Sequence, residues 1–255
     1  MEESIKLLLK KFYEIRELGY VKTTRGGSTG IGKTFEDLLG KAEDRSTNPD
    51  YYGIEIKTKL VNSDKYTTLF NLTPKGKEQF EIKRLVKTYG YPDKTMKSCK
   101  ILNATIYGSC LSCIAAKYFM GLIIDYKQRK IFLKVINMNM DLLENYVFWD
   151  FDELEERLNK KLKYLAVVNA SKRYTHGIAY YHYKRIDFYY LKDFNTFLKL
   201  IEQGIICITF HIGIVKSGER KGEIHDRGTS FRIKECNLTK LFDKIPLKDL
   251  KDRRT

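Results

Sequence analysis

The chain has 255 residues, of which 43% are hydrophobic and 13% aromatic, enough to build one packed domain or two lobes. It carries 47 Lys and Arg against 32 Asp and Glu, and this net charge of +15 attracts polyanions such as nucleic acids. The charged fraction of 31%, and the lack of any apolar run near the roughly 20 residues that span a bilayer, argue against a membrane protein. The first residues do not resemble a signal peptide, so we expect a cytoplasmic protein.

The five cysteines are an odd number, which argues against a disulfide framework. Cys110 and Cys113 have the CxxC spacing of zinc and redox sites, but a second close pair is lacking. The four histidines also lack the close spacing of a zinc-binding pair. We therefore expect incidental thiols, and the role of Cys110 and Cys113 stays open at this point.

The N-terminal region predicts two helices joined by a loop. Apolar residues recur at helical spacing over residues 3–18. Residues 22–32 hold four glycines and predict a loop. A second helix is expected to begin at Thr34, with Asp37 completing a capping box, and to end before Gly40.

The rest of the chain alternates predicted strands with a few helices. Two pairs of strands, 119–125 with 130–136 and 178–183 with 186–191, are expected to form hairpins. A long loop is expected over residues 216–228. The remaining predicted strands are 53–59, 66–72, 101–107, 164–169, 205–215 and 231–233, and the remaining predicted helices are 79–89, 151–162 and 193–202. The pattern predicts an α/β (α+β) fold with a mixed central sheet flanked by helices.

Residues 27–34 fit the GxxxxGK[ST] pattern of a phosphate-binding loop. This motif offers an alternative function, a P-loop NTPase in which Asp125 would bind magnesium. Such a loop follows a buried parallel strand, whereas residues 20–25 are mostly polar and charged. We expect instead a glycine-rich loop that leads into a helix and can touch a DNA phosphate.

The segment 48–59 carries the pattern that is most informative about chemistry. Glu55 and Lys57 are two apart on a predicted strand, so their side chains share a face. Ile54 and Ile56 point to the other face and can anchor the strand in a core. By spacing alone the pair could be a structural ion pair on an edge strand. The preceding Pro-Asp, the predicted turn, the flanking isoleucines and the basic charge favour a catalytic role.

Asp50 lies five residues before Glu55, so an unbroken strand would point it to the opposite face. Pro49 and Gly53 bracket it, and we expect a turn or bulge that brings Asp50 back toward Glu55. The two carboxylates and the carbonyl of Ile56 would then suit Mg²⁺.

Three ordered segments resemble the MvaI/BcnI family of restriction endonucleases, which belong to the PD-(D/E)xK nucleases and are related to the nicking enzyme MutH. They are residues 30–39, residues 49–58, and residues 216–232 with their Lys-Ser-Gly and His-Asp-Arg-Gly stretches. The helix 152–163 and the strand that follows are also similar to the family. Residues 80–116 are not clearly similar.

The resemblance implies a Mg²⁺-dependent type II restriction enzyme, with Mn²⁺ as a substitute, that cuts double-stranded DNA and leaves 5′-phosphate and 3′-hydroxyl ends. It implies a short, GC-rich, pseudo-palindromic target, a monomer with two lobes around a DNA-binding cleft, and a cognate methyltransferase as genetic partner. We expect residues 1–140 to form the catalytic lobe and 141–255 the recognition lobe. The implied active-site set is Glu36, Asp50, Glu55 and Lys57.

The remaining candidate residues are cations suited to DNA. Histidine and arginine side chains suit guanine edges, and lysines and Arg220 suit phosphates, as does Lys33 in the glycine-rich loop. The candidates for bases are His211, His225, Arg227 and Arg232, and those for phosphates are Lys33, Lys216, Arg220 and Lys221. A MutH-like nicking enzyme is the closest alternative to a restriction enzyme.

Overall fold

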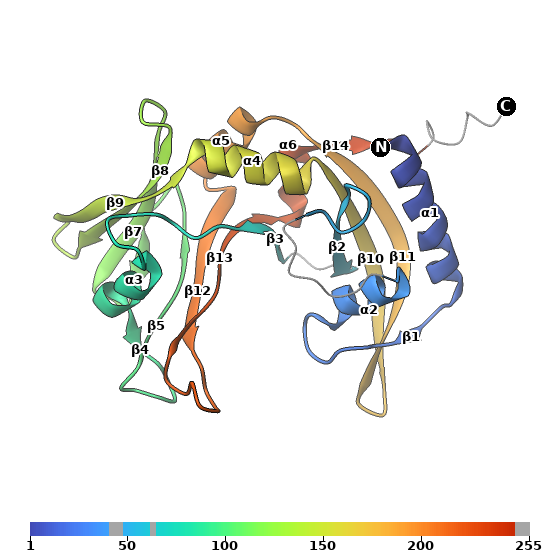
Figure 1. Cartoon of the computed structure of the whole chain (residues 1–255), viewed down its shortest axis with the longest axis horizontal. Coiled ribbons are helices and arrows are strands. Elements are labelled where there is room, and N and C mark those ends of the chain that lie inside the picture. Colours follow the sequence, from blue (N-terminus) through green and yellow to red (C-terminus); the bar gives the residue numbers. More distant parts are fainter. Residues whose placement is uncertain (41–47, 62–64, 248–255) are drawn as a thin grey trace. The chain divides into compact units, whose positions relative to one another are not determined.

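The computed structural model describes residues 1–40, 48–61 and 65–247 (Figure 1). The chain forms two compact units and passes between them several times. The first unit comprises Met1–Lys65, Leu158–Lys192 and Phe242–Thr255, and the second comprises Tyr66–Arg157 and Asp193–Leu241. The units therefore interleave along the chain and are not separated by a boundary near residue 140. The assignment of catalytic and recognition roles to lobes stays a prediction.

The first unit is built on one mixed sheet with the order β1-β11-β10-β2, and β14 pairs with β11. Strands β10 and β2 are parallel, and the other pairs are antiparallel. The elements are α1 (Glu2–Glu17), β1 (Val21–Lys22), α2 (Gly30–Leu38), β2 (Glu55–Leu60), β10 (Tyr164–Thr175), β11 (Ile178–Leu191) and β14 (Phe242–Ile245).

Helix α1 covers one face of this sheet. Its apolar positions recur at helical spacing, and Leu8 and Phe12 are fully buried in one core with Ile56 of β2 and Tyr183 of β11. Burial of each such side chain stabilises the fold by about 1.5–3 kcal/mol. The face that carries Ile56 is therefore committed to the core, and Glu55 and Lys57 lie on the opposite face.

The second unit contains two antiparallel sheets, with the orders β3-β13-β12-β5-β4 and β6-β7-β8-β9. Trp149 on β9 contacts Phe210 and Phe231 on β12 and β13, which joins the two sheets in one core. The strands are β3 (Tyr66–Asn71), β4 (Tyr91–Pro92), β5 (Lys100–Ile106), β6 (Ser112–Ile114), β7 (Tyr118–Asp125), β8 (Lys130–Asn137), β9 (Leu142–Asp150), β12 (Ile206–Ile214) and β13 (Ile224–Lys234). The helices are α3 (Glu81–Tyr89), α4 (Phe151–Leu162), which continues into the first unit, α5 (Phe194–Glu202), α6 (Leu238–Leu241) and the 3₁₀ turn η1 (Glu235–Asn237).

The predicted mixed α/β fold class is confirmed, but several predicted boundaries were wrong. Helix α2 begins at Gly30, so Thr34 is a buried helical residue and not the cap; its hydroxyl accepts a hydrogen bond from the backbone of Thr24. The segments 178–183 and 186–191 form one continuous strand that pairs with β10. A bulge at Lys184 interrupts its alternation, which is why the sequence suggests two strands.

The predicted loop 216–228 is shorter, because β13 begins at Ile224 and already includes His225 and Arg227. The strand predicted over residues 231–233 is the last part of β13, which lies between β3 and β12. Among the described residues, no helix combines the length and hydropathy needed to cross a bilayer.

Candidate active site

A two-residue turn sets the position of Asp50. Tyr51 and Ile54 exchange backbone hydrogen bonds of 2.9 and 2.8 Å around Tyr52 and Gly53. Both central residues have positive φ, 42° and 86°, as a type I′ turn requires. The chain therefore reverses direction directly after Asp50. The bend predicted between Pro49 and Gly53 is confirmed, and it returns Asp50 to β2.

The Asp50 carboxylate accepts a hydrogen bond of 2.9 Å from the backbone N–H of Ile56. In the strand order of the described residues, β2 lies at the edge of its sheet next to β10. An N–H that donates to Asp50 points away from β10, and the carbonyl of the same strand residue points the same way. The Asp50 carboxylate and the Ile56 carbonyl therefore lie at the same edge of β2, which pairs with no described strand.

Glu55 is a buried carboxylate, with only 2% of its surface exposed. Its Oε1 accepts a hydrogen bond of 2.6 Å from the ammonium of Lys57, and its Oε2 has no partner among the described residues. Burial raises the pKa of Glu55, Lys57 opposes this rise, and the nearby Asp50 carboxylate adds to it. An unpartnered buried carboxylate oxygen is costly, and a bound cation would relieve that cost.

Lys161 is a site residue that the sequence does not single out. It lies in the last turn of α4, and its ammonium is 3.5 Å from Glu55 Oε1. The sequence shows only a basic helix end, which is the ordinary complement of the helix dipole. Only the fold brings that end beside β2, because β10, which follows α4, pairs in parallel with β2 from Leu165 and Glu55 onward.

Glu36 is half-buried on α2. A Cβ at Gly32 would come within 3.3 Å of the Thr58 hydroxyl, so this face of α2 lies against β2. Glu36 is one turn further along the same face. Its predicted role as a further active-site carboxylate remains a prediction.

The donors that the site offers to a metal are two carboxylates and one backbone carbonyl. Among the described residues, no group of three or more His, Cys, Asp and Glu side chains is placed to hold a metal ion. A cation here would therefore depend on the carbonyl of Ile56 as its third protein ligand. Oxygen donors of this kind suit a hard divalent cation. Cys110 and Cys113 are exposed free thiols.

The structure argues against the P-loop NTPase. The strand before the loop, β1, has two residues and pairs antiparallel with β11, so it is not a buried parallel strand. Gly30 is already helical, and Lys33 is ion-paired with Asp37 one turn along α2. In a P-loop NTPase this lysine would need to reach the nucleotide. The predicted contact of Lys33 with a DNA phosphate stays a prediction.

Three of the residues predicted to contact bases lie together in the second unit. His211 is on β12, and Arg227 and Arg232 are on β13. Burial lowers the pKa of His211, and the charges of Arg232 and Arg227 lower it further, which favours the neutral imidazole. A neutral imidazole offers one donor and one acceptor. His225, the fourth, is exposed on β13.

The same sheet brings polar residues to His211 that sequence analysis missed. His211 is in register with Asn103 of β5, and Ser230 is in register with Asn71 of β3. The Ser230 hydroxyl lies 2.7 Å from the Asn71 side-chain oxygen. Each of these residues is a polar position in an alternating strand. Their assembly depends on strand pairing that the sequence does not reveal.

The cations predicted to contact phosphates have different surroundings. Lys216 is exposed but ion-paired with Asp93, and it also donates to the Thr95 hydroxyl at 2.7 Å. Arg220 pairs with Glu223 at 2.7 Å. Lys221 is exposed in the same loop. Lys216 thus has a structural contact whatever its role toward DNA.

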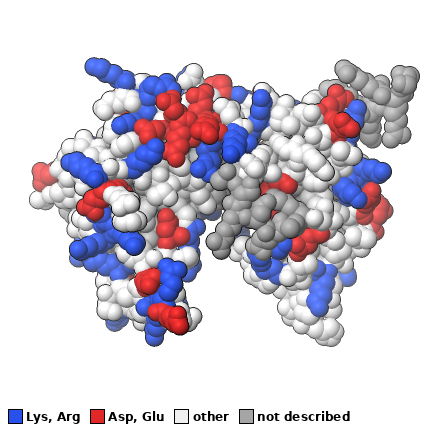
Figure 2. Space-filling model, viewed as in Figure 1, with Lys and Arg blue, Asp and Glu red and all other residues white. Residues whose placement is uncertain are grey.

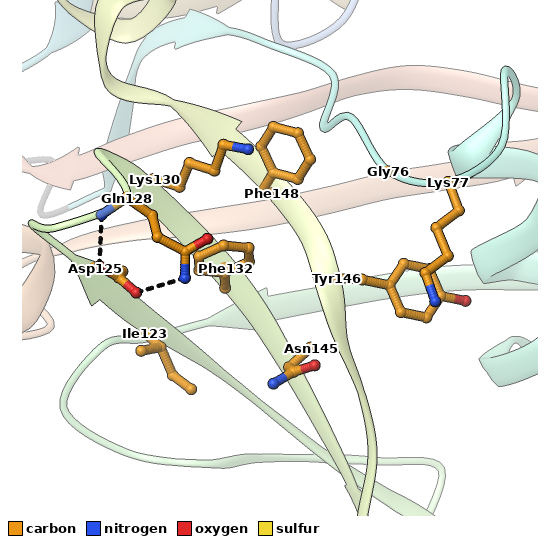
Figure 3. A pocket seen from close by; sticks show the side chains of 10 residues that line it. All are labelled: Gly76, Lys77, Ile123, Asp125, Gln128, Lys130, Phe132, Asn145, Tyr146 and Phe148. Carbon is orange, nitrogen blue, oxygen red and sulfur yellow. Dashed lines mark hydrogen bonds between the residues drawn. The ribbon is translucent and has the colours of Figure 1, made fainter.

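Two other surface features of the second unit do not carry the predicted chemistry. The first turn of α4 is acidic, and Figure 2 shows the carboxylates gathered over it. A hollow of about 480 Å³ lies beside β8 and β9, lined by Phe132 and Phe148 among others (Figure 3). Its one carboxylate, on Asp125, accepts two hydrogen bonds from Gln128. None of the residues predicted for the nuclease site or for DNA contact lines the hollow.

The fold and the arrangement of Asp50, Glu55 and Lys57 resemble those of the PD-(D/E)xK nucleases. The model of the MvaI/BcnI restriction endonuclease family matches residues 9–242. The chain belongs to this family and is a type II site-specific deoxyribonuclease.

Solved structures agree with this assignment. A complex of restriction endonuclease MvaI with its cognate DNA substrate is 33% identical, with 96% of this chain and 98% of that chain covered and a TM-score of 0.88. MvaI in the absence of DNA has the same identity and coverage and a TM-score of 0.63. No curated protein matches the chain. Restriction endonucleases generally use divalent metal ions, which agrees with the oxygen donors at β2.

Proposed function

We propose that the protein is a Mg²⁺-dependent restriction endonuclease that hydrolyses both strands of DNA within a short, GC-rich, pseudo-palindromic sequence. The observation that carries the proposal is the meeting of Asp50, Glu55 and Lys57 at the edge of β2. A buried carboxylate whose second oxygen has no partner in the described part of the chain, beside another carboxylate and an ammonium, is suited to metal-assisted hydrolysis.

Asp50, Glu55 and the carbonyl of Ile56 would hold the cation, and Glu36 would supply a further carboxylate. Mn²⁺, which also accepts carboxylate and carbonyl oxygens, would substitute for Mg²⁺. When bound, the cation supplies charge neutralisation of the scissile phosphate and lowers the pKa of a water ligand.

Lys57 acts on the reacting atoms. Its ammonium, held beside Glu55, orients the attacking water and stabilises negative charge on the phosphate oxygens. The water oxygen forms a new bond to phosphorus as the bond from phosphorus to the 3′ oxygen breaks. The water gives up a proton, and the leaving 3′ oxygen gains one. The products are a 5′-phosphate and a 3′-hydroxyl.

We propose that the second unit recognises DNA through polar side chains of β12 and β13 and through the loop between these two strands. His211, His225, Arg227 and Arg232 would contact base edges, and Lys216, Arg220 and Lys221 would contact phosphates. Lys33 would contact a phosphate from the first unit. The relative MvaI has been solved with its cognate DNA substrate, which supports duplex DNA as the ligand.

We further propose that the protein acts as a monomer in the cytoplasm and cuts the two strands in succession. A restriction enzyme of this kind requires a cognate DNA methyltransferase that protects the host. That partner is genetic, and no contact between the two proteins is needed.

Plasmid cleavage with Mg²⁺ tests the proposal, with Glu55→Gln as the variant. The change keeps the size of the side chain but removes its charge, and we expect cleavage to fall by at least about 10²–10³-fold. Glu14→Gln is the matched control, because Glu14 is exposed and, among the described residues, is ion-paired with Lys11 one turn away. Discrete linear fragments support the proposal, lasting open circles would indicate a MutH-like nicking enzyme, and cleavage by Glu55→Gln at the wild-type rate would refute the site.

A further inference from the structure

Strands β10 and β11 extend as a two-stranded ribbon beyond the active-site strand. The pairing of β2 with β10 ends at Leu60 and Ala170, while β10 continues to Thr175 and β11 starts at Ile178 (Figure 1). The short strand β1 pairs with β11 at Tyr180 and Tyr181. The ribbon belongs to the same unit as Glu55 and Lys57.

The strand registers show which side chains of the ribbon share the face of Glu55 and Lys57. Val167 is in register with Lys57, and Asn169 with Lys59, so these side chains lie on the same face. Along β10 the alternation continues with Ser171 and Arg173. The opposite face carries Ala170, Tyr181 and Tyr183, which are buried in the core with α1.

The bulge at Lys184 keeps β11 in phase with this arrangement. Arg185, which follows the bulge in the chain, is in register with Asn169, and His182 and Tyr180, which precede the bulge, are in register with Ser171 and Arg173. Without the extra residue, the last two would turn toward the core.

This face is basic. Strand register adds Lys22 of β1 beside Tyr180, and Lys244 of β14 beside Tyr189. The acid that register places among these cations is Asp187, which pairs with Arg185 at 2.7 Å and Lys244 at 2.8 Å. Burial lowers the pKa of Lys59, the charge of Arg185 lowers it further, and the charge of Asp187 raises it.

Aromatic rings hold the outermost arginine in place. The guanidinium of Arg173 lies 4.2 Å from the ring centroid of Tyr20 and 5.8 Å from that of Tyr180. Tyr20 in turn contacts His182, with ring centroids 5.4 Å apart. Such contacts restrict an otherwise flexible side chain, while Arg173 itself stays exposed.

An unpartnered donor lies where the basic face leaves the active site. The amide nitrogen of Asn169 is buried and has no hydrogen-bond partner among the described residues. Asn169 sits between Lys59 and Arg185 in register. A buried donor without a partner costs free energy, and an acceptor oxygen from a ligand would satisfy it.

We infer that this face, from Lys59 through Arg185 to Arg173 and Lys22, is a phosphate-binding track for the duplex that flanks the target sequence. From Val167, beside Lys57, to Arg173 the strand rises six residues, or about 20 Å at 3.3 Å each. At about 3.4 Å per nucleotide of one strand, that is the reach of about six nucleotides. The inference rests on the proposed function, because the track is measured from the scissile DNA phosphate that is proposed to lie at Lys57.

Substitutions at two neighbouring residues test the track, and each removes one positive charge. Arg173→Gln removes a cation from the active-site face, and Lys172→Gln removes one from the opposite face, where the ammonium lies 4.4 Å from the Tyr174 ring centroid. Binding to duplex DNA without divalent cations is measured over a range of salt concentrations. We expect Arg173→Gln to lower the slope of log Kd against log salt by about 1 and Lys172→Gln to leave it unchanged.

Flank length supplies a second readout. Duplexes centred on the mapped cleavage site, with flanks of about 12 or about 3 base pairs, bracket the reach of the ribbon. Wild-type protein and Lys172→Gln should bind the long duplex more tightly than the short one, and Arg173→Gln should lose that advantage. Equal slopes for the two variants, or equal loss of the flank advantage, would overturn the track. Failure of the wild-type protein to cut DNA would instead overturn the proposed function.

Discussion

The carboxylate of Asp50 accepts a hydrogen bond of 2.9 Å from the backbone N–H of Ile56, six residues later. This bond ties the side chain before the turn to the edge of the strand after it. Asp50 is thereby placed where the Ile56 carbonyl emerges and next to the buried carboxylate of Glu55, whose pKa it helps to raise. The position of Asp50 beside Glu55 thus depends on the turn that separates the two residues.

Substitution of Gly53 should weaken both the turn and the activity. Gly53 has φ of 86°, which a residue with a Cβ adopts at a cost of about 1–2 kcal/mol, so Gly53→Ala should destabilise the unit by about that amount and reduce cleavage. Gly26→Ala is the control, because a Cβ there would meet nothing within 4 Å. Urea unfolding and plasmid cleavage measure the two effects. Equal behaviour of both variants would contradict the role of the turn.

Lys161 should contribute to catalysis through Glu55. Lys161→Ala removes an ammonium 3.5 Å from Glu55 Oε1, and we expect kcat to fall about tenfold, less than for Lys57→Ala. Lys160→Ala, in the same helical turn but exposed, should leave kcat unchanged. Single-turnover cleavage of a saturating duplex gives the comparison. If loss of Lys160 slows cleavage as much as loss of Lys161, the effect is one of general charge.

Arg84 should be the most important charge for the stability of the second unit. It pairs with Glu81 at 2.7 Å and Glu144 at 2.6 Å, and both carboxylates are 2% exposed. Arg84→Met would leave two buried carboxylates without a cation, and we expect a loss of about 3–5 kcal/mol in unfolding free energy.

Arg129→Met provides the contrast, because Arg129 and its partner Asp152 are both exposed. That variant should change stability little. Denaturant unfolding followed by Trp149 fluorescence reports on this unit, since Trp149 is buried in its core. A small loss of unfolding free energy in Arg84→Met would contradict the prediction. It would show that Glu81 and Glu144 become protonated when Arg84 is removed.

The ion pair between Asp93 and Lys216 should make stability depend on pH. Lys216 and Thr95 hold the pKa of Asp93 well below its ordinary value of 3.8. A carboxylate whose pKa is lower in the folded state stabilises the fold above the unfolded value, and this contribution is lost as the pH falls further. We therefore expect wild-type protein to be more stable than Asp93→Asn at pH 6, with the difference shrinking as the pH falls below about 3.8. Urea midpoints at several pH values test this, and a constant difference would contradict it.

The sequence by itself determined the features that depend on neighbouring residues. The spacing of apolar residues predicts α1, and the two-residue period of a strand places Glu55 and Lys57 on one face. The proline and glycine around Asp50 predict the turn that the structure contains. The resemblance carried by the ordered motifs predicts the family. All of these follow from local chain geometry, which acts over a few residues.

Only the tertiary structure decided which distant residues meet. The approach of Lys161 to Glu55, of Asn103 to His211, and the common face of Lys57 and Arg173 all depend on strand register. Register is set by core packing and by bulges such as Lys184, and a shift of one residue would turn every side chain to the other face. A linear pattern contains no such information, because pairing joins residues that are far apart in the chain.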